Sequence, residues 1–206
     1  MTTMKTVITS QNSLLTILRS RSASILVALT LGAFALASDP TAFGVVSAPD
    51  GGYPGGNTAE GDNALFSLTT GANNTAIGQD ALFTNTTGSN NTANGTDALA
   101  DNTTGSFNTA NGFTALFHNT TGIENTANGL SALQENTTGN FNTGNGVDAL
   151  FANTLGSFNT ADGFLTLFAN TTGNFNTANG AAALQNNTTG GNNTAAGAQS
   201  RRSFSV

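Results

Sequence analysis

The chain contains no cysteine and no tryptophan, and only 8% of its 206 residues are charged. A typical soluble domain has about 25% charged residues. The lack of cysteine excludes disulfides and thiolate metal sites. The five basic residues lie near the two ends of the chain, at Lys5, Arg19, Arg21, Arg201 and Arg202. Nucleic acids and anionic membrane surfaces require a basic surface, so we expect neither as a partner.

The N-terminal segment has the layout of a secretory signal peptide. Basic residues precede an apolar run from Ile25 to Ala37, which ends in a small-x-small cleavage pattern at Ala35-Leu36-Ala37. The run is shorter than the roughly 20 residues that a membrane-spanning helix needs. We therefore expect residues 1–37 to direct export and the mature chain to have no membrane span. The expected location is secreted or cell surface, of bacterial type.

Three further zones follow the signal. Residues 38–56 contain all three prolines and several glycines, which indicates a linker or an entry cap. Residues 57–200 are a repeat, in which phrases such as NTANGFTALFHNTTG return every 17 residues from Asn57 to Asn193. Residues 201–206 form a short tail. A fixed short period without insertions is typical of a solenoid, in which each unit stacks on its neighbours.

The residue types favour strands over helices. Glycine recurs too often within each unit for a helix of useful length. We predict an all-β fold, a parallel β-solenoid (β-roll) with 17 residues per coil, about eight coils and a partial ninth. Each coil would have two extended segments, NTAxG and ALFxNTTG in outline. Sharp corners would lie at glycines, which accept positive φ: Gly61, Gly71, Gly78, Gly88, Gly95, Gly105, Gly112 and Gly122.

Two apolar columns are candidates for the core. Neighbouring residues of a strand point to opposite faces, so an invariant position next to a variable one indicates the inner face. The leucine column is Leu65, Leu82, Leu99, Leu116, Leu133, Leu150, Leu167 and Leu184. The alanine column includes Ala76, Ala93, Ala110, Ala127, Ala161 and Ala178, with Gly144 as an exception.

One coil alone buries little apolar surface, which favours stacked Asn ladders and oligomerisation as further sources of stability. Two partly aromatic columns offer surface for a homo-oligomer. One includes Phe66, Phe83, Phe117, Phe151 and Phe168. The other, the candidate oligomer interface, is Phe107, Phe141, Phe158 and Phe175. The alternative interpretation is that these side chains only cover the corners.

NTAIGQDALFTNTTG and its copies resemble the β-roll repeats in the heads of trimeric autotransporter adhesins, and the NTAxG/NTTG arrays of bacterial surface and tail-fibre-like proteins. This resemblance covers residues 57–200. It implies a left-handed roll that forms trimers and is displayed on a cell or virion surface. The repeats here are longer than those of the adhesin heads and contain less Val and Ile.

No catalytic or metal-binding constellation is apparent. His118 lies in a variable polar column, and we interpret it as a solvated surface residue. Acidic pairs do not recur from coil to coil, so a stacked calcium site is not expected. We expect no cofactor and no enzymatic activity.

The threonine columns are the remaining signal for binding. The possible surface-binding residues are Thr75, Thr92, Thr109, Thr126, Thr143, Thr160 and Thr177. A second array would combine Asn85, Asn102 and their equivalents with Thr86 and its equivalents. Flat uncharged arrays on a rigid solenoid suit ice, and NTAxG resembles the repeats of some plant ice-binding proteins. The simpler interpretation is that Thr suits strands and Asn suits corners.

The sequence thus predicts an exported, non-catalytic structural or adhesive rod: an adhesin head, a spacer or a fibre segment that contacts a host or matrix surface. The first alternative is an ice-binding solenoid that uses the Thr and Asn columns. The second is a glycan-binding fibre with the Phe107 column as a stacking platform.

Overall fold

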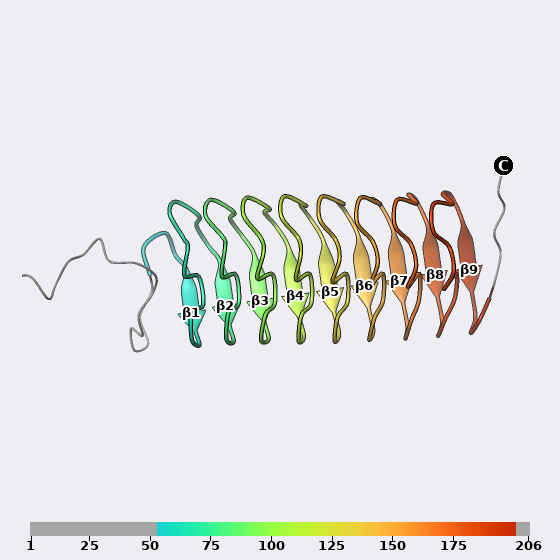
Figure 1. Cartoon of the computed structure of the whole chain (residues 1–206), viewed down its shortest axis with the longest axis horizontal. Coiled ribbons are helices and arrows are strands. Elements are labelled where there is room, and N and C mark those ends of the chain that lie inside the picture. The colour runs from blue at the N-terminus through green and yellow to red at the C-terminus, as the bar shows by residue number, and fades with distance from the viewer. Residues whose placement is uncertain (1–52, 201–206) are drawn as a thin grey trace, which may run out of the picture. The chain divides into compact units, whose positions relative to one another are not determined.

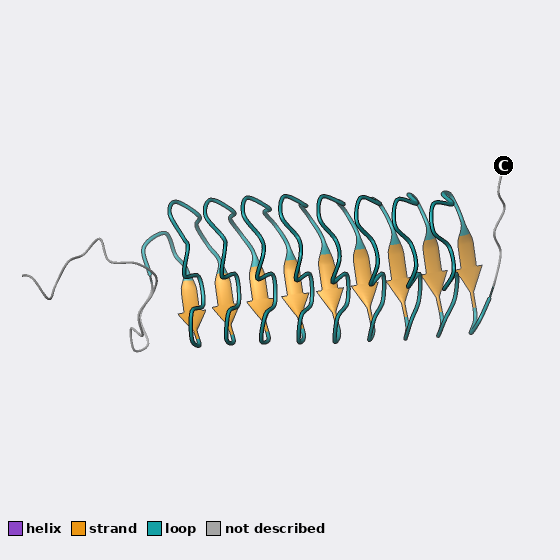
Figure 2. Ribbon diagram, viewed as in Figure 1, coloured by secondary structure: helices purple, strands orange, loops and turns teal. Residues whose placement is uncertain are grey.

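The computed structural model describes residues 53–200, and these form a β-solenoid. The signal peptide predicted for residues 1–37, the tail at 201–206 and all of the predicted linker before Tyr53 lie outside the described residues. Nine short strands form one parallel sheet in chain order (Figures 1 and 2). They are β1 (Thr58–Glu60), β2 (Thr75–Ile77), β3 (Thr92–Asn94), β4 (Thr109–Asn111), β5 (Thr126–Asn128), β6 (Thr143–Asn145), β7 (Thr160–Asp162), β8 (Thr177–Asn179) and β9 (Thr194–Ala196).

The register of the sheet equals the period of the sequence. Thr75 pairs with Thr92, and Ala76 pairs with Ala93, so each residue stacks on its counterpart in the next repeat. We number the coils from the Asn that begins each repeat, with coil 1 at Asn57, coil 4 at Asn108 and coil 9 at Asn193. The predicted fold, a parallel β-solenoid with one repeat per coil, is confirmed.

Backbone hydrogen bonds between coils continue beyond the three strand residues. After the strand, the Leu99 amide donates to the Ala115 carbonyl at 3.0 Å, and the Thr103 amide donates to the Thr120 carbonyl at 3.0 Å. The Phe107 amide donates in the opposite direction, to Ser89 in the preceding coil, also at 3.0 Å. Neighbouring coils are therefore joined around most of their circumference, although the sheet itself is narrow.

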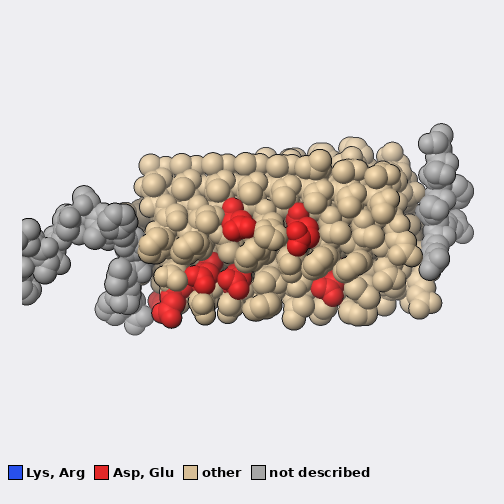
Figure 3. Space-filling model, in the orientation of Figure 1, with Lys and Arg blue, Asp and Glu red and all other residues tan. Residues whose placement is uncertain are grey.

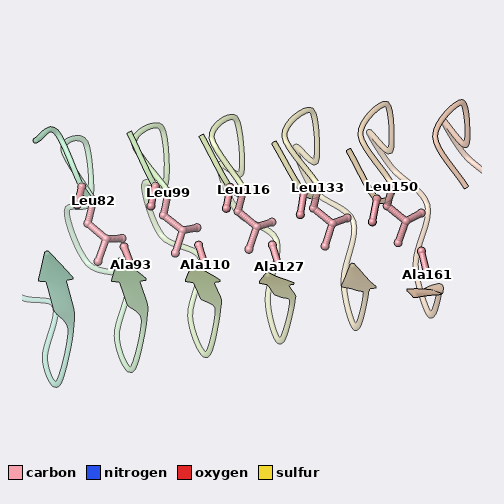
Figure 4. Close-up of a cluster of buried hydrophobic side chains, with 14 of the residues drawn as sticks. Leu82, Ala93, Leu99, Ala110, Leu116, Ala127, Leu133, Leu150 and Ala161 are labelled. Carbon is pink, nitrogen blue, oxygen red and sulfur yellow. The ribbon is translucent and has the colours of Figure 1, made fainter. Parts of the chain in front are cut away.

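The core consists of the leucine and alanine columns. All eight leucines from Leu65 to Leu184 are buried, as are Ala76, Ala93, Ala110, Ala127, Ala161 and Ala178. A second alanine column, from Ala64 to Ala183, precedes the leucines and is also buried wherever it holds Ala. The Leu side chains point toward the Ala of the following strand, as Leu82 does toward Ala93 and Leu99 toward Ala110 (Figure 4). Tyr53, which precedes coil 1, and Leu68, in coil 1, pack against this core.

The prediction of a second extended segment in each coil, ALFxNTTG in outline, is wrong. The stretch after each strand is a run of tight turns, in which the core leucines have left-handed φ values, such as 53° at Leu99 and 53° at Leu116. These turns close with hydrogen bonds between residues three apart, as from the Asn102 amide to the Leu99 carbonyl at 3.1 Å. The turns bring the Leu and the preceding Ala into the interior, which an alternating strand could not do with neighbouring residues.

The two glycines of each repeat have different roles. Gly61, Gly78, Gly95 and Gly112 have positive φ, as expected at a corner. Gly71, Gly88, Gly105 and Gly122 do not, so the positive φ predicted for them is wrong. A Cβ at Gly105 would overlap the carbonyl oxygen of Gly122 and lie 2.8 Å from Nδ2 of Asn119. These glycines are therefore required by the close approach of the next coil.

Candidate functional site

The interior is partly polar, because two columns of asparagine run through it. The first column begins every repeat, from Asn57 to Asn193, and is buried. Asn91 shows its bonding: the backbone amide and Nδ2 both donate to Oδ1 of Asn74, at 3.0 and 3.1 Å. Each side chain therefore satisfies the backbone of the next coil as well as its neighbour in the column.

The second asparagine column lies in the interior, which shows that its predicted position on the surface is wrong. Asn85, Asn102 and their equivalents up to Asn170 were expected in a surface array, but they are fully buried. Nδ2 of Asn102 donates to Oδ1 of Asn85 at 2.8 Å, and Nδ2 of Asn119 donates to Oδ1 of Asn102 at the same distance. Their role is internal, so they cannot contact an outside partner.

Both columns meet at the second glycine of each coil. The Gly105 carbonyl accepts from Nδ2 of Asn91 at 2.9 Å and from Nδ2 of Asn102 at 3.0 Å. The same pair of bonds recurs at Gly122 and at the later equivalents as far as Gly190. Buried amides and carbonyls are costly unless they are paired. The repeated Asn therefore makes this narrow corner stable without apolar side chains.

The threonine hydroxyls of the expected second array already form hydrogen bonds within the solenoid. The Thr86 hydroxyl donates to the Thr103 carbonyl at 3.0 Å, and the Thr103 hydroxyl donates to the Thr120 carbonyl at 2.9 Å. These half-buried hydroxyls bind the next coil, so they are not free to bind a partner.

The outer face of the sheet is the surface that remains polar and accessible. Thr75, Thr92, Thr109, Thr126 and Thr143 are half-buried, and Thr160 and Thr177 are exposed. They form one file, at the coil spacing of about 4.8 Å. The last residue of each strand forms a parallel file, in which Nδ2 of Asn111 donates to Asn128 at 2.8 Å and Nδ2 of Asn128 donates to Asn145 at 2.9 Å. This strand face is uncharged in β3 to β6.

The Phe107 column is exposed but largely self-stacked. The rings of Phe141 and Phe158 lie 4.8 Å apart and nearly parallel, and those of Phe158 and Phe175 lie 5.0 Å apart. Phe107 is separated from them by Glu124. Because the rings cover each other's faces, the middle of this row offers edges rather than open faces to a partner. The Phe66 column also stacks, in the pairs Phe66–Phe83 and Phe151–Phe168.

A third apolar column was missed in the sequence. Phe113, Leu130, Val147 and Phe164 follow the positive-φ glycine in coils 4 to 7, and each is 40–54% exposed. We call these four residues the corner stripe. The sequence could have predicted the corner stripe, because four successive repeats hold a large apolar residue at the position where the first three hold Asp62, Gln79 and Thr96.

His118 is not simply solvated. Its Nδ1 lies 2.7 Å from Oδ2 of Asp101, and its Nε2 lies 3.9 Å from Oε2 of Glu135. These three residues occupy one column in coils 3, 4 and 5. They are half-exposed, and such surface pairs contribute little stability. No cluster of three metal-ligating side chains is present among residues 53–200.

The charge of the solenoid is entirely acidic and unevenly distributed. Residues 53–200 contain nine carboxylates and no Lys or Arg. On the face in Figure 3, the acidic side chains lie mostly over the N-terminal half. Burial raises the pKa of Asp97, and the neighbouring Asp80 raises it further, while burial raises the pKa of Asp148. Asp80 and Asp97, which occupy the same position in coils 2 and 3, therefore repel each other.

Comparison with protein-family models, with curated proteins and with solved structures gives no match for this chain. Within residues 53–200, there is no helix of the length and hydrophobicity needed to cross a membrane. The repeat architecture itself is therefore the basis for a functional proposal.

Proposed function

We propose that the chain is an exported, non-catalytic rod that works as an adhesive or structural segment at a bacterial surface. The observation that carries this proposal is the continuity of the stack: backbone bonds and one asparagine column join coil to coil from Asn57 to Asn193. A second asparagine column joins the coils from Asn85 to Asn187. Such a stack is stiff along its axis and presents every outer column at one fixed spacing. These properties suit a spacer or an adhesin head.

The outer surface supports repetition as the means of contact. Each outer column repeats a weak contact at equal intervals, and several weak contacts made together bind more tightly than one. The resemblance to autotransporter heads supports the same role. We propose that export uses residues 1–37 and that the mature chain begins at Ser38. N-terminal sequencing of the protein that a bacterial host exports tests this start; a retained Met1 would contradict it.

Adhesion is tested with beads coated with the full chain. The beads are passed over a gel of extracellular-matrix protein, a mucin layer and bare glass, and retained beads are counted under flow. Control beads carry Leu116→Asp, which places a charge in the core and unfolds the middle coils. We expect wild-type beads to be retained more strongly on at least one surface. Equal retention on all three surfaces would contradict an adhesive role.

The strand face favours a second candidate function, binding to ice or another regular crystal. Its Thr file and Asn file are uncharged over four coils and share one spacing. An ice-recrystallisation assay of the full chain tests this candidate with the double variant Thr109→Leu/Thr126→Leu. The matched control is Thr121→Leu/Thr138→Leu, a pair of exposed threonines that lies off the strand face. Activity that only the first variant removes would support ice binding, and inactive wild type would exclude it.

The glycan-binding alternative has weaker support. A sugar stacks on the flat face of an aromatic ring, but the faces in the Phe141–Phe158–Phe175 row are turned toward one another. Only the end faces of that row, and the separate Phe107, remain as platforms.

A further inference from the structure

The corner stripe is an apolar surface that the proposed rod does not require. Phe113 and Phe164 are 53% and 54% exposed, and Leu130 and Val147 lie between them at 48% and 40%. Monomeric soluble proteins rarely expose a contiguous row of large apolar side chains, and such rows mark interaction sites. The row spans four coils, about 19 Å at the parallel strand spacing.

We propose that the corner stripe pairs two copies of this chain in antiparallel orientation, about an axis between Leu130 and Val147. A second copy is the partner because it carries the same spacing, so that its side chains meet the stripe in register along the whole length. A twofold interface joins the same surface on both copies. In this arrangement Leu130 faces the other copy's Val147, and Phe113 faces the other copy's Phe164.

The distribution of charge selects the antiparallel orientation. At the two positions after the positive-φ glycine, the first three coils carry Asp62, Asp80 and Asp97. Coils 8 and 9 carry only uncharged residues there, Ala181, Ala182, Ala198 and Gln199. In a parallel pair, each carboxylate would face the same carboxylate of the other chain, and like charges in contact are destabilising. The antiparallel pair places Asp80 and Asp97 opposite the uncharged coils 9 and 8. No basic residue in 53–200 could neutralise them otherwise.

This pairing goes beyond the proposed function, because a single rod could adhere equally well. The stripe has four side chains, whereas a stable interface uses about 20–30 residues per side, so we expect a weak pair that dissociates on dilution. Light scattering of the full chain after gel filtration, over a concentration series, should give the mass of two chains at the highest concentration. A single-chain mass throughout, or the three-chain mass of a trimer, would overturn the proposal.

Matched variants identify the surface. Leu130→Ser/Val147→Ser should give single chains at every concentration, with unchanged circular dichroism because both positions are exposed. Phe141→Ser/Phe158→Ser, in the separate aromatic row, should still form the pair. The opposite result, in which the corner variant pairs and the aromatic variant does not, would place the interface elsewhere.

Cysteine cross-linking tests the orientation, because the chain has no cysteine of its own. The exposed Gln79 and Ala198 lie in coils 2 and 9, which face each other only in the antiparallel pair. A mixture of Gln79→Cys and Ala198→Cys chains should form a disulfide-linked pair under mild oxidation, whereas Gln79→Cys alone should not. In a parallel pair, these two coils would be about 34 Å apart. Rapid cross-linking of Gln79→Cys alone would overturn the antiparallel model. The bead assay of the proposed function measures retention on a surface, whereas light scattering and cross-linking measure pairing. Failure of the proposed function and failure of the pairing can therefore be told apart.

Discussion

Nδ2 of Asn119 donates to Oδ1 of Asn102 at 2.8 Å, although the two residues lie 17 positions apart in the chain. The same contact recurs at the same distance from Asn85 to Asn187. This repeated hydrogen bond joins each of coils 2 to 8 to the next coil in that series. The solenoid is therefore stabilised by a polar column as well as by its narrow apolar core.

We expect Asn119→Ala to lower the free energy of unfolding by roughly 2–4 kcal/mol. It leaves the buried Oδ1 of Asn102 and Nδ2 of Asn136 each without one partner, and a buried unpaired polar group costs about 1–3 kcal/mol. Urea unfolding of the full chain measures the loss. The control, Asn145→Ala, removes a similar bond from the half-exposed strand face and should cost less than about 1 kcal/mol. Equal losses would contradict a special role for the buried column.

Gly144→Ala should stabilise the protein by about 0.5–1 kcal/mol, because Gly within a strand is less stable than Ala by that amount. All eight other strands already hold Ala at this buried position, and the nearest atom to the new Cβ is the Ala149 oxygen at 3.1 Å. Gly146→Ala is the matched control in the same coil. Its φ is 128°, and its Cβ would lie 2.7 Å from Gly163, so it should destabilise. Thermal melts that move in the same direction would refute this distinction.

Thr114→Asn should raise the stability by about 0.5–1 kcal/mol. Thr114 has a φ of 51°, a left-handed conformation that is unfavourable for a β-branched residue and less so for Asn. Asn63 and three Asp residues adopt it at the same position in other coils. Thr109→Asn in β4 is the control and should slightly destabilise, because Asn is unfavourable in strands. The melting temperatures of the two variants should therefore move in opposite directions.

The unfolding free energy should increase as the pH falls from 7 toward 4. The folded-state pKa of Asp97 is raised above 3.8 by burial and by Asp80, so folding favours the protonated carboxyl. That stabilisation is complete below the unfolded pKa and is lost as the pH rises through the folded pKa. Asp97→Asn should be more stable than wild type at pH 7 and should show a smaller pH dependence. A wild-type solenoid that weakens steadily from pH 7 to 4 would contradict this expectation.

The period of the sequence was enough to predict the fold. An unbroken repeat fixes which residues stack, so the parallel register of Ala76 on Ala93 follows directly from it. The backbone conformation of the corners could not be predicted from the sequence. Leu rarely adopts positive φ, and no sequence feature indicates that Leu99 does so. Tertiary packing overrides the local preference at that position.

The surface was harder to predict than the interior. Asn suits both exposed corners and buried ladders, so composition alone could not show that Asn102 lies inside and Asn111 outside. Thr103 and Thr109 are both half-buried, but only the Thr103 hydroxyl donates a hydrogen bond to the next coil. These assignments depend on how the turns direct each side chain, which repetition does not specify.

Proteolysis of the full chain tests the central claim, a single continuous and stable rod, most directly. Trypsin is uninformative because residues 22–200 contain no Lys or Arg, so thermolysin, which cleaves at apolar residues, is the suitable protease. Exposed apolar side chains occur in most coils, yet cleavage requires local unfolding of backbone that is bonded on both sides. We predict one surviving fragment that contains residues 57–200. A series of fragments that differ by one repeat would show that the coils open independently and would contradict the account.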